Sequence, residues 1–331
     1  MMPTRPKPQH SFIRLTALLV VFAGAIWVIL NRQFVIDQST VWDYKPSADI
    51  ASIASRAQLS DKGKFYFYAS RPAIDGRSAF NTHCQQLIEK TAILGCYVDR
   101  QIYIFNITDR RLDGIREVTA AHEMLHAAYD RLSDSERKRL DSLIETHAKN
   151  ISDDKLTRRL ALYDKTEPGE RLNELHSILG TEITSLSPEL EAHYHQYFTD
   201  RARLVALSNQ YETVFQQIED RQTTLIAELN DLADRVDRES NAYETALNDL
   251  KDDIADFNRR AETGTFSSQS MFTTERTALI ARQSALQRQR TSINEMISIY
   301  NQKNTELDSL NTTAEGLQRS INAALPEAPS L

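Results

Sequence analysis

Two histidines flank a glutamate in the segment His122-Glu123-Met124-Leu125-His126. Residues four apart lie on the same face of a helix, so His122 and His126 can present two imidazoles to one metal ion. Glu123 lies beside them, where its carboxylate can accept a proton from a water that zinc activates. This spacing indicates zinc-dependent hydrolysis, with His122 and His126 as metal ligands and Glu123 as the general base.

The surrounding sequence has the pattern of a buried amphipathic helix. Apolar residues recur at helical spacing from Asp113 to about Leu132, and Glu123 is the only Asp, Glu, Lys or Arg between Val118 and Tyr129. The alternative is an ordinary solvated helix with two exposed histidines paired to Glu123, and the near absence of charge disfavours it. We therefore expect the three residues to lie on a buried metal-binding helix.

A catalytic zinc site with water in its fourth position needs a third protein ligand. Two candidates, Glu174 and His176, lie in a helix expected from 169 to 180. Both side chains ligate zinc, but two residues apart on a helix they point in different directions, so only one can face the metal. A cysteine upstream, Cys84 or Cys96, is a weaker alternative because no convincing motif surrounds either residue. From the residues alone, the third position stays open.

The combination of this motif with a downstream glutamate preceded by Asn173 resembles the gluzincin clan of zinc metallopeptidases. The resemblance covers about residues 64–200 and favours Glu174 over His176 as the third ligand. It implies a zincin-like catalytic domain, a zinc cofactor, and a peptide or protein substrate. In that clan an upstream edge strand binds substrate as an added strand, and the resemblance gives this role to Gln101–Asn106.

The sequence departs from thermolysin-like members of that clan at one supporting position. Ile178 stands where those enzymes carry an aspartate that holds a metal-ligating histidine, so the outer support must differ here, and Glu182 is a candidate. A tyrosine or histidine should stabilise the developing oxyanion, and Tyr163 and Tyr194 are unranked candidates. Three other histidines are expected to serve surface or packing roles: His147, His193 and His195.

An uncharged apolar run from Leu15 to Leu30 lies near the N-terminus. We expect a transmembrane signal-anchor over 13–31, because the run continues past the small residues Ala23-Gly24-Ala25, where a cleaved signal peptide would end. Basic residues precede the run and acidic residues follow it, which predicts a cytoplasmic N-terminus at 1–12 and a single-pass protein of the cell membrane. The catalytic domain then lies outside the cytoplasm.

The chain between the membrane and the coiled coil is expected to form a juxtamembrane connection over 32–62 and a catalytic domain over 63–200. A short helix is predicted at 48–58, and strands at 65–69, 96–98 and 101–106 from their aromatic and β-branched content. Helices are predicted at 134–150, at 153–163 and from Ser187-Pro188 onward. Cys84 and Cys96 can form a disulfide outside the cytoplasm or remain as two buried thiols.

The last third of the chain has coiled-coil patterning, and we expect an antiparallel helical hairpin over 201–325 followed by a disordered tail at 326–331. A break at Gly264-Thr265-Phe266-Ser267-Ser268 separates the two arms. Seven residues of the second arm fall every seventh position: Leu279, Leu286, Ile293, Tyr300, Leu307, Ala314 and Ile321. The fold class is therefore α+β and mostly helical.

The length of the hairpin predicts a protein partner and also supports a rival interpretation. In that rival, the chain is a non-catalytic, membrane-tethered coiled-coil scaffold whose head domain binds zinc or is degenerate. A net charge of −7 gives no sequence-wide basic field, so nucleic acid is not expected as a partner.

Overall fold

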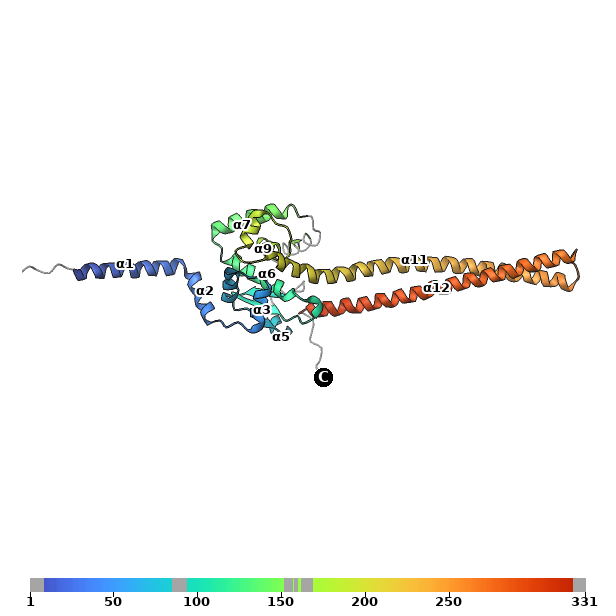
Figure 1. Cartoon of the computed structure of the whole chain (residues 1–331), viewed down its shortest axis with the longest axis horizontal. Coiled ribbons are helices and arrows are strands. Elements are labelled where there is room, and N and C mark those ends of the chain that lie inside the picture. Colours follow the sequence, from blue (N-terminus) through green and yellow to red (C-terminus); the bar gives the residue numbers. More distant parts are fainter. Residues whose placement is uncertain (1–8, 85–93, 152–156, 158–159, 162–168, 324–331) are drawn as a thin grey trace, which may run out of the picture. The chain divides into compact units, whose positions relative to one another are not determined.

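The computed structural model describes residues 9–84, 94–151, 157, 160–161 and 169–323 (Figure 1). These residues are mostly helical and include one three-stranded sheet, as the sequence predicted. The chain divides into two compact units, which we call the head (Met1–Val214 with Gln318–Leu331) and the arm (Phe215–Leu317). Each unit is described separately below.

The head contains the sheet and the shorter helices. In chain order, its elements are α1 (Gln9–Leu30), α2 (Arg32–Asp43), α3 (Ala48–Arg56), α4 (Asp61–Ala69), β1 (Ala73–Asp75), α5 (Arg77–Cys84), β2 (Gly95–Val98), β3 (Gln101–Phe105), a 3-10 turn (Arg110–Leu112), α6 (Ile115–Asp130), α7 (Asp134–Ala148), α9 (Arg171–Thr181) and α10 (Pro188–Tyr194). Helix α11 (Arg201–Glu262) begins in the head, and α12 (Gln269–Ile321) ends there.

Helix α6 carries His122, Glu123 and His126 and lies at the centre of the head. It packs against α9, α3 and α4 and against both β2 and β3. Most of its residues are buried, including Ala120, Ala121, Ala127 and Ala128, whose small side chains let neighbouring elements approach closely. The prediction of a buried helix here is confirmed.

The sheet has the strand order β1-β3-β2, with β1 parallel and β2 antiparallel to β3. The strands predicted at 96–98 and 101–106 are confirmed as β2 and β3. The prediction that Gln101–Asn106 forms a substrate-binding edge is wrong, because β3 is hydrogen-bonded on both sides and has no free edge for another strand. Among the described strands, β2 has β3 as its only partner and forms one edge.

The strand predicted at 65–69 is instead the second half of helix α4. Ser60 caps this helix by accepting a hydrogen bond from Gly63 N at 3.1 Å, and Phe67 is fully buried in the core. A Cβ atom on Gly63 would approach the Tyr197 carbonyl oxygen to 2.3 Å, so the helix packs directly on backbone. Capping and tertiary packing therefore override the strand propensity of the aromatic residues.

The predicted connection at 32–62 contains two helices that are packed into the head. Helix α3 confirms the short helix expected at 48–58, and its residues Ile50, Ile53 and Ala54 are buried. Helix α2 was not predicted, and its Asp37 is also buried. This segment therefore contributes to the core of the head.

Helix α1 contains the apolar run near the N-terminus. Within the described residues, no single helix meets the length and hydropathy expected of a membrane span. Leu15–Leu30 and Arg32–Asp43 meet that criterion together, as a pair bent by 83°.

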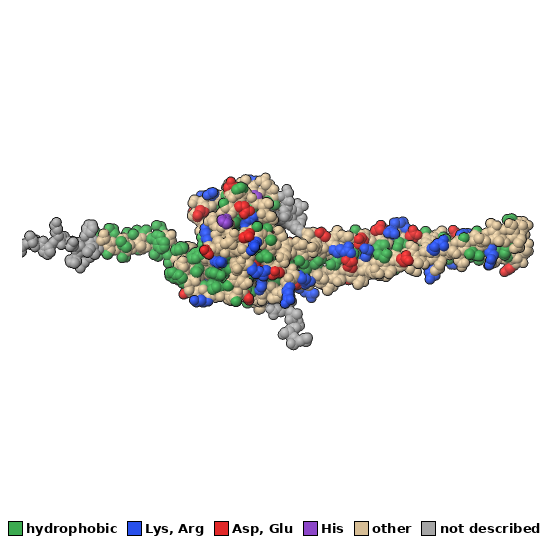
Figure 2. Space-filling model, in the orientation of Figure 1, with side chains coloured by type: hydrophobic (Ala, Val, Ile, Leu, Met, Phe, Trp, Pro, Cys, Tyr) green, Lys and Arg blue, Asp and Glu red, His purple; other side chains and the backbone are tan. Residues whose placement is uncertain are grey.

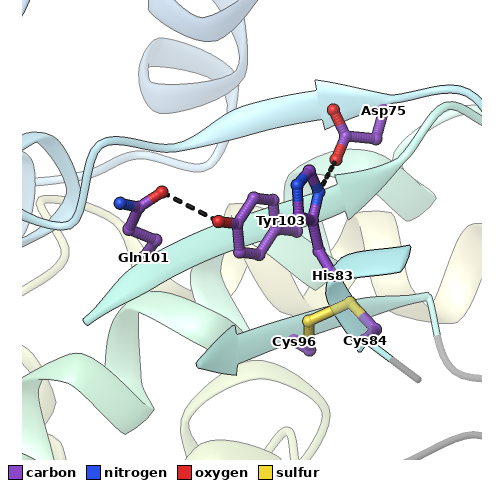
Figure 3. The surroundings of a disulfide bond; sticks show 6 residues. All are labelled: Asp75, His83, Cys84, Cys96, Gln101 and Tyr103. Carbon is purple, nitrogen blue, oxygen red and sulfur yellow. Dashed lines mark hydrogen bonds and ion pairs between the residues drawn. A yellow bond between two sulfur atoms is a disulfide. The ribbon is translucent and has the colours of Figure 1, made fainter. Parts of the chain in front are cut away.

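Cys84 and Cys96 form a disulfide that joins the end of α5 to β2, with an S–S distance of 2.00 Å (Figure 3). Both residues are buried. Beside the bond, the His83 ring stacks on Tyr103 at 4.1 Å between centroids and its Nδ1 lies 2.8 Å from Asp75 Oδ2. The disulfide thus links the edge strand β2 to helix α5, and neither cysteine is free to bind a metal.

The arm is an antiparallel pair formed by the long parts of α11 and α12, as the sequence predicted. Ion pairs join successively earlier residues of α12 to later residues of α11, from Arg221 with Glu306 to Arg282 with Asp253. None of the seven heptad residues of α12 is exposed. Leu232 of α11 packs with Ile293 and Met296 of α12 in a buried cluster.

Helices α7, α9 and α10 confirm the helices predicted at 134–150, at 169–180 and from Ser187-Pro188. The helix predicted at 153–163 falls largely outside the described residues. The predicted tail at 326–331 and most of the N-terminal segment 1–12 also lie outside them.

The close approach of α9 to α6 gives a stability prediction at Gly180. A Cβ atom there would lie 2.4 Å from Leu125 Cδ1 and 2.7 Å from Tyr194 Cε1. We expect Gly180→Ala to lower the free energy of unfolding by about 1–3 kcal/mol, because an added methyl overfills a packed core. Urea unfolding of the purified chain measures this change. Gly76→Ala is the matched control, since no atom lies within 4 Å of its Cβ position. Equal stability of the two variants would contradict the packing.

Candidate metal site

His122 and His126 on α6 face Glu174 on α9. The Nε2 atom of His122 lies 3.6 Å from Glu174 Oε2, and that of His126 lies 3.4 Å from Glu174 Oε1. One donor atom from each residue lies within 4.8 Å of the other two. The group is largely shielded from solvent, and it could hold a metal ion.

The packing of α9 on α6 brings Glu174 to this position. Leu175, Ile178 and Leu179 are buried on α9, and Gly180 allows that helix to approach Leu125. Glu174 lies in the first turn of α9, so its carboxylate projects from the end of the helix that lies over the histidine pair. The position of Glu174 therefore depends on how two helices distant in sequence pack together.

Asn173 fixes the orientation of the His126 ring. Its Oδ1 lies 2.9 Å from His126 Nδ1, and its Nδ2 donates to Glu170 Oε2 at 2.9 Å. Because the Nδ2 amide donates to Glu170, Oδ1 is the acceptor and His126 Nδ1 carries the proton. His126 Nε2 then keeps its lone pair and points toward Glu174, as a metal ligand requires.

The spacing of the donors fits a small divalent ion. Bonds of about 2.0–2.1 Å in tetrahedral geometry place neighbouring ligand atoms about 3.3 Å apart. Each imidazole nitrogen lies near this distance from one of the two Glu174 oxygens, at 3.6 Å for His122 and 3.4 Å for His126, while one donor atom from each of the three residues lies within 4.8 Å of the others. Two imidazoles and one carboxylate also form a donor set that suits zinc.

Glu123 is buried beside the donor group, with a relative exposure of 6%. Burial raises the pKa of its carboxyl group, while His126 and His122 act in the opposite direction. A Cβ atom on Gly95 of β2 would lie 2.8 Å from Glu123 Oε1, so the edge strand lies directly against this side chain. The structure thus places Glu123 between the donor group and β2.

Burial is the largest single influence on the pKa of His122, and it favours the neutral imidazole. The hydrogen bond and charge of Glu174, together with the other nearby carboxylates, outweigh burial and raise the pKa of His122 above its ordinary value. Glu123 and Glu182 add smaller contributions in the same direction. Glu182, the candidate outer support, therefore acts on His122 through its charge, while Asn173 supports His126 by direct contact.

His176 lies away from the donor group and contacts His193, with 2.9 Å between their Nε2 atoms. Burial lowers the pKa of His176 well below its ordinary value and lowers that of His193 to about 4, so both rings are neutral near pH 7. The choice of Glu174 over His176 therefore agrees with the geometry. The packing role expected for His193 agrees with its contact with His176.

The expectation that Tyr194 could stabilise an oxyanion is wrong. Its side chain is fully buried, and its hydroxyl donates to the carbonyl oxygen of His176 at 2.7 Å. This hydroxyl is therefore part of the packing between α9 and α10. The other candidate, Tyr163, lies outside the described residues.

Two contributors to the site were not predicted from the sequence. The asparagine before Glu174 was noted as part of a motif, but its contact with His126 required the fold. Nothing in the sequence marked Gly95 as part of the site, because its role depends on the close contact between β2 and α6. Comparisons with protein-family models, curated proteins and solved structures found no match to this chain.

The contact between Asn173 and His126 predicts an effect on metal affinity. We expect Asn173→Ala to weaken zinc binding about 10–100-fold, because the His126 ring loses its orienting partner. Competition with a chromophoric chelator measures this affinity. Asn150→Ala is the control, since Asn150 is exposed and its side chain, among the described residues, hydrogen-bonds to the Thr146 carbonyl oxygen. Unchanged affinity in Asn173→Ala would exclude the orienting role.

The raised pKa of His122 predicts the pH dependence of metal binding. A metal ion must displace the proton from this imidazole, so zinc affinity should fall as the pH is lowered through the raised pKa and level off above it. Chelator competition between about pH 8 and pH 6 covers the range in which histidine titrates. An affinity that stays constant over this range would contradict the coupling between Glu174 and His122.

Proposed function

We propose that this chain is a membrane-anchored zinc metallohydrolase that cleaves peptide bonds, with a zincin-like, gluzincin-related head. The observation that carries the proposal is the convergence of His122, His126 and Glu174 from two helices, with Glu123 buried beside them. A purely structural zinc site is closed by four protein ligands. Among the described residues three donors converge, one fewer than a closed structural site has, which favours hydrolysis.

Zinc is the metal that this donor set suits best, with His122 Nε2, His126 Nε2 and a Glu174 oxygen as its ligands. When bound, zinc would polarise the scissile carbonyl and lower the pKa of water in the site. Asn173 holds the His126 ring with Nε2 toward Glu174. The orientation that a metal ligand needs is therefore set by contacts within the protein.

Glu123 is proposed as the general base. Its carboxylate takes a proton from the attacking water and later delivers that proton to the leaving amine. Burial raises the pKa of this carboxyl group, which makes the carboxylate a stronger base than an exposed glutamate. Glu123 lies next to β2, so a substrate bound along that strand would lie close to its carboxylate.

The edge strand β2 is proposed to bind the substrate, in place of β3. An extended peptide can hydrogen-bond to the free side of an edge strand. Gly95 in β2 lies against Glu123, so a peptide added there would run beside the general base. The disulfide of Cys96 with Cys84 holds this strand in place.

The membrane anchor is proposed to be α1, with a cytoplasmic N-terminus and the head outside the cytoplasm. The support is the uncharged run Leu15–Leu30, with basic residues before it. The side chains of Leu15–Leu30 are all exposed in the isolated chain, as expected for a helix that contacts lipid. A disulfide in the head also suits an oxidising compartment.

Under the proposed mechanism, substitutions of Glu123 and His122 should differ in their effects on zinc content. We expect Glu123→Gln to retain zinc but to lose about 10²–10⁴-fold in peptide hydrolysis, because the amide cannot accept the proton. His122→Ala should lose the metal together with activity. Zinc content and cleavage of an unfolded protein mixture, followed by mass spectrometry, measure both properties. Full activity in a metal-loaded Glu123→Gln preparation would eliminate the proposed reaction.

The second candidate is a membrane-tethered scaffold, and the arm favours it. Helices α11 and α12 contain 62 and 53 residues, or roughly 90 and 80 Å at about 1.5 Å per residue, which suits a partner-binding rod. A protein partner for the arm is compatible with either function. Zinc content and hydrolysis in the Glu123 experiment separate them, because a scaffold gives no cleavage that depends on Glu123.

A further inference from the structure

Helix α2 has an inner face that is fixed to the head by a buried ion pair. Asp37 is 3% exposed, and its carboxylate accepts hydrogen bonds from Arg131 Nε at 2.8 Å and Nη2 at 2.9 Å. Gln33 donates to the same carboxylate at 2.8 Å. Arg131 directly follows α6 and also donates to the Ala127 carbonyl oxygen and the Tyr97 hydroxyl. The pair therefore sets which side of α2 faces the core.

The outer side of α2 exposes three large apolar side chains among polar ones. Trp42, Phe34 and Ile36 are 74%, 47% and 42% exposed, and Arg32, Ser39 and Asp43 are exposed as well. At about 100° per residue, Trp42 lies on the side of the helix away from Asp37, and Phe34 and Ile36 lie on its two flanks. Because the ion pair prevents α2 from rotating about its axis, Trp42 cannot turn into the head.

Phe34 joins the exposed apolar side chains of α2 to the proposed anchor. Figure 2 shows hydrophobic side chains along α1, and the Trp27 ring of α1 lies 6.3 Å from the Phe34 ring of α2, edge to face. Phe34 in turn lies 5.8 Å from Phe65 of α4. An aromatic series therefore runs from α1 through α2 into the head.

The bend between the two helices places α2 where a membrane surface would be. The axes of Leu15–Leu30 and Arg32–Asp43 differ by 83°, so α2 runs nearly parallel to the bilayer when α1 crosses it. The uncharged run of α1 is also short, because Leu15–Leu30 spans roughly 24 Å and the hydrocarbon core is about 30 Å thick. Further apolar contact must come from a neighbouring element, and tryptophan is favoured at the lipid boundary.

We propose that α2 is an interfacial helix that lies on the outer surface of the bilayer, with Trp42 at the boundary between headgroups and acyl chains. Its inner face holds the head through Asp37 and Arg131, so the head has one fixed orientation against the lipid surface. This inference rests on the proposed anchor. It commits to lipid as the occupant because the exposed apolar side chains of α2 directly follow the helix proposed to cross the bilayer.

The two tryptophans of the chain provide the test, since Trp27 lies in α1 and Trp42 in α2. Trp27→Phe leaves Trp42 as the only tryptophan. The full chain is reconstituted in phosphatidylcholine–phosphatidylglycerol vesicles with acyl chains brominated at shallow or deep positions. We expect the Trp42 emission to be blue-shifted, to lose more intensity with shallow than with deep bromines, and to resist aqueous iodide.

Two results would overturn the proposal. Red-shifted emission that iodide quenches and bromine does not would place Trp42 in water. Emission shielded from both quenchers would place it in a protein interface. Trp27 and Trp42 are both at least half exposed, so Phe substitutions should not disturb packing, and unchanged zinc affinity of the variants checks that the head remains folded.

The matched variant Trp42→Phe reports on the anchor separately. Its remaining Trp27 should be quenched most strongly by deep bromines. Loss of this quenching, or failure of the chain to float with the vesicles, would reject the anchor and the interfacial helix together. Quenching of Trp27 by deep bromines combined with a water-exposed Trp42 would reject the interfacial helix alone.

Discussion

The packing of α9 against α6 is the constraint on which the candidate site depends. His122 and His126 come from one helix turn, but Glu174 reaches them only because Gly180 lets α9 approach Leu125 closely. A buried carboxylate is costly without a compensating partner, and in this structure the two imidazoles provide one. The same contact raises the pKa of His122, so stability, protonation and metal binding are linked through a single helix interface.

The second face of α6 determines what can reach the donor group. Gly95 lies against Glu123 on the edge strand, and the disulfide holds that strand to α5. A larger residue at 95 would displace either the strand or the carboxylate. The proposed general base and the proposed substrate strand are therefore positioned by one close contact, and β3 stabilises the arrangement from the centre of the sheet.

The end of α6 connects the candidate site to helix α2. Arg131 joins Asp37 of α2 to the Tyr97 hydroxyl of β2, so one guanidinium contacts the helix next to the proposed anchor and the proposed substrate strand. Buried ion pairs of this kind fix geometry more than they add stability, because desolvation offsets most of their attraction. The orientation of α2 on the head is thus part of the same hydrogen-bonded structure that supports β2.

Local patterns in the sequence determined the buried helix with His122 and His126, the strands β2 and β3, and the helical hairpin with its heptad seam. Each of these depends on residues close together in the chain, whose periodicity reports which face is buried. Tertiary structure decided the rest. The aromatic segment at 65–69 became helical because capping and core packing outweighed strand propensity, and the edge of the sheet moved from β3 to β2 because β1 pairs with β3. Whether Glu174 or His176 faces the metal group also depended on helix packing, because the two have similar affinity for zinc and only their directions differ.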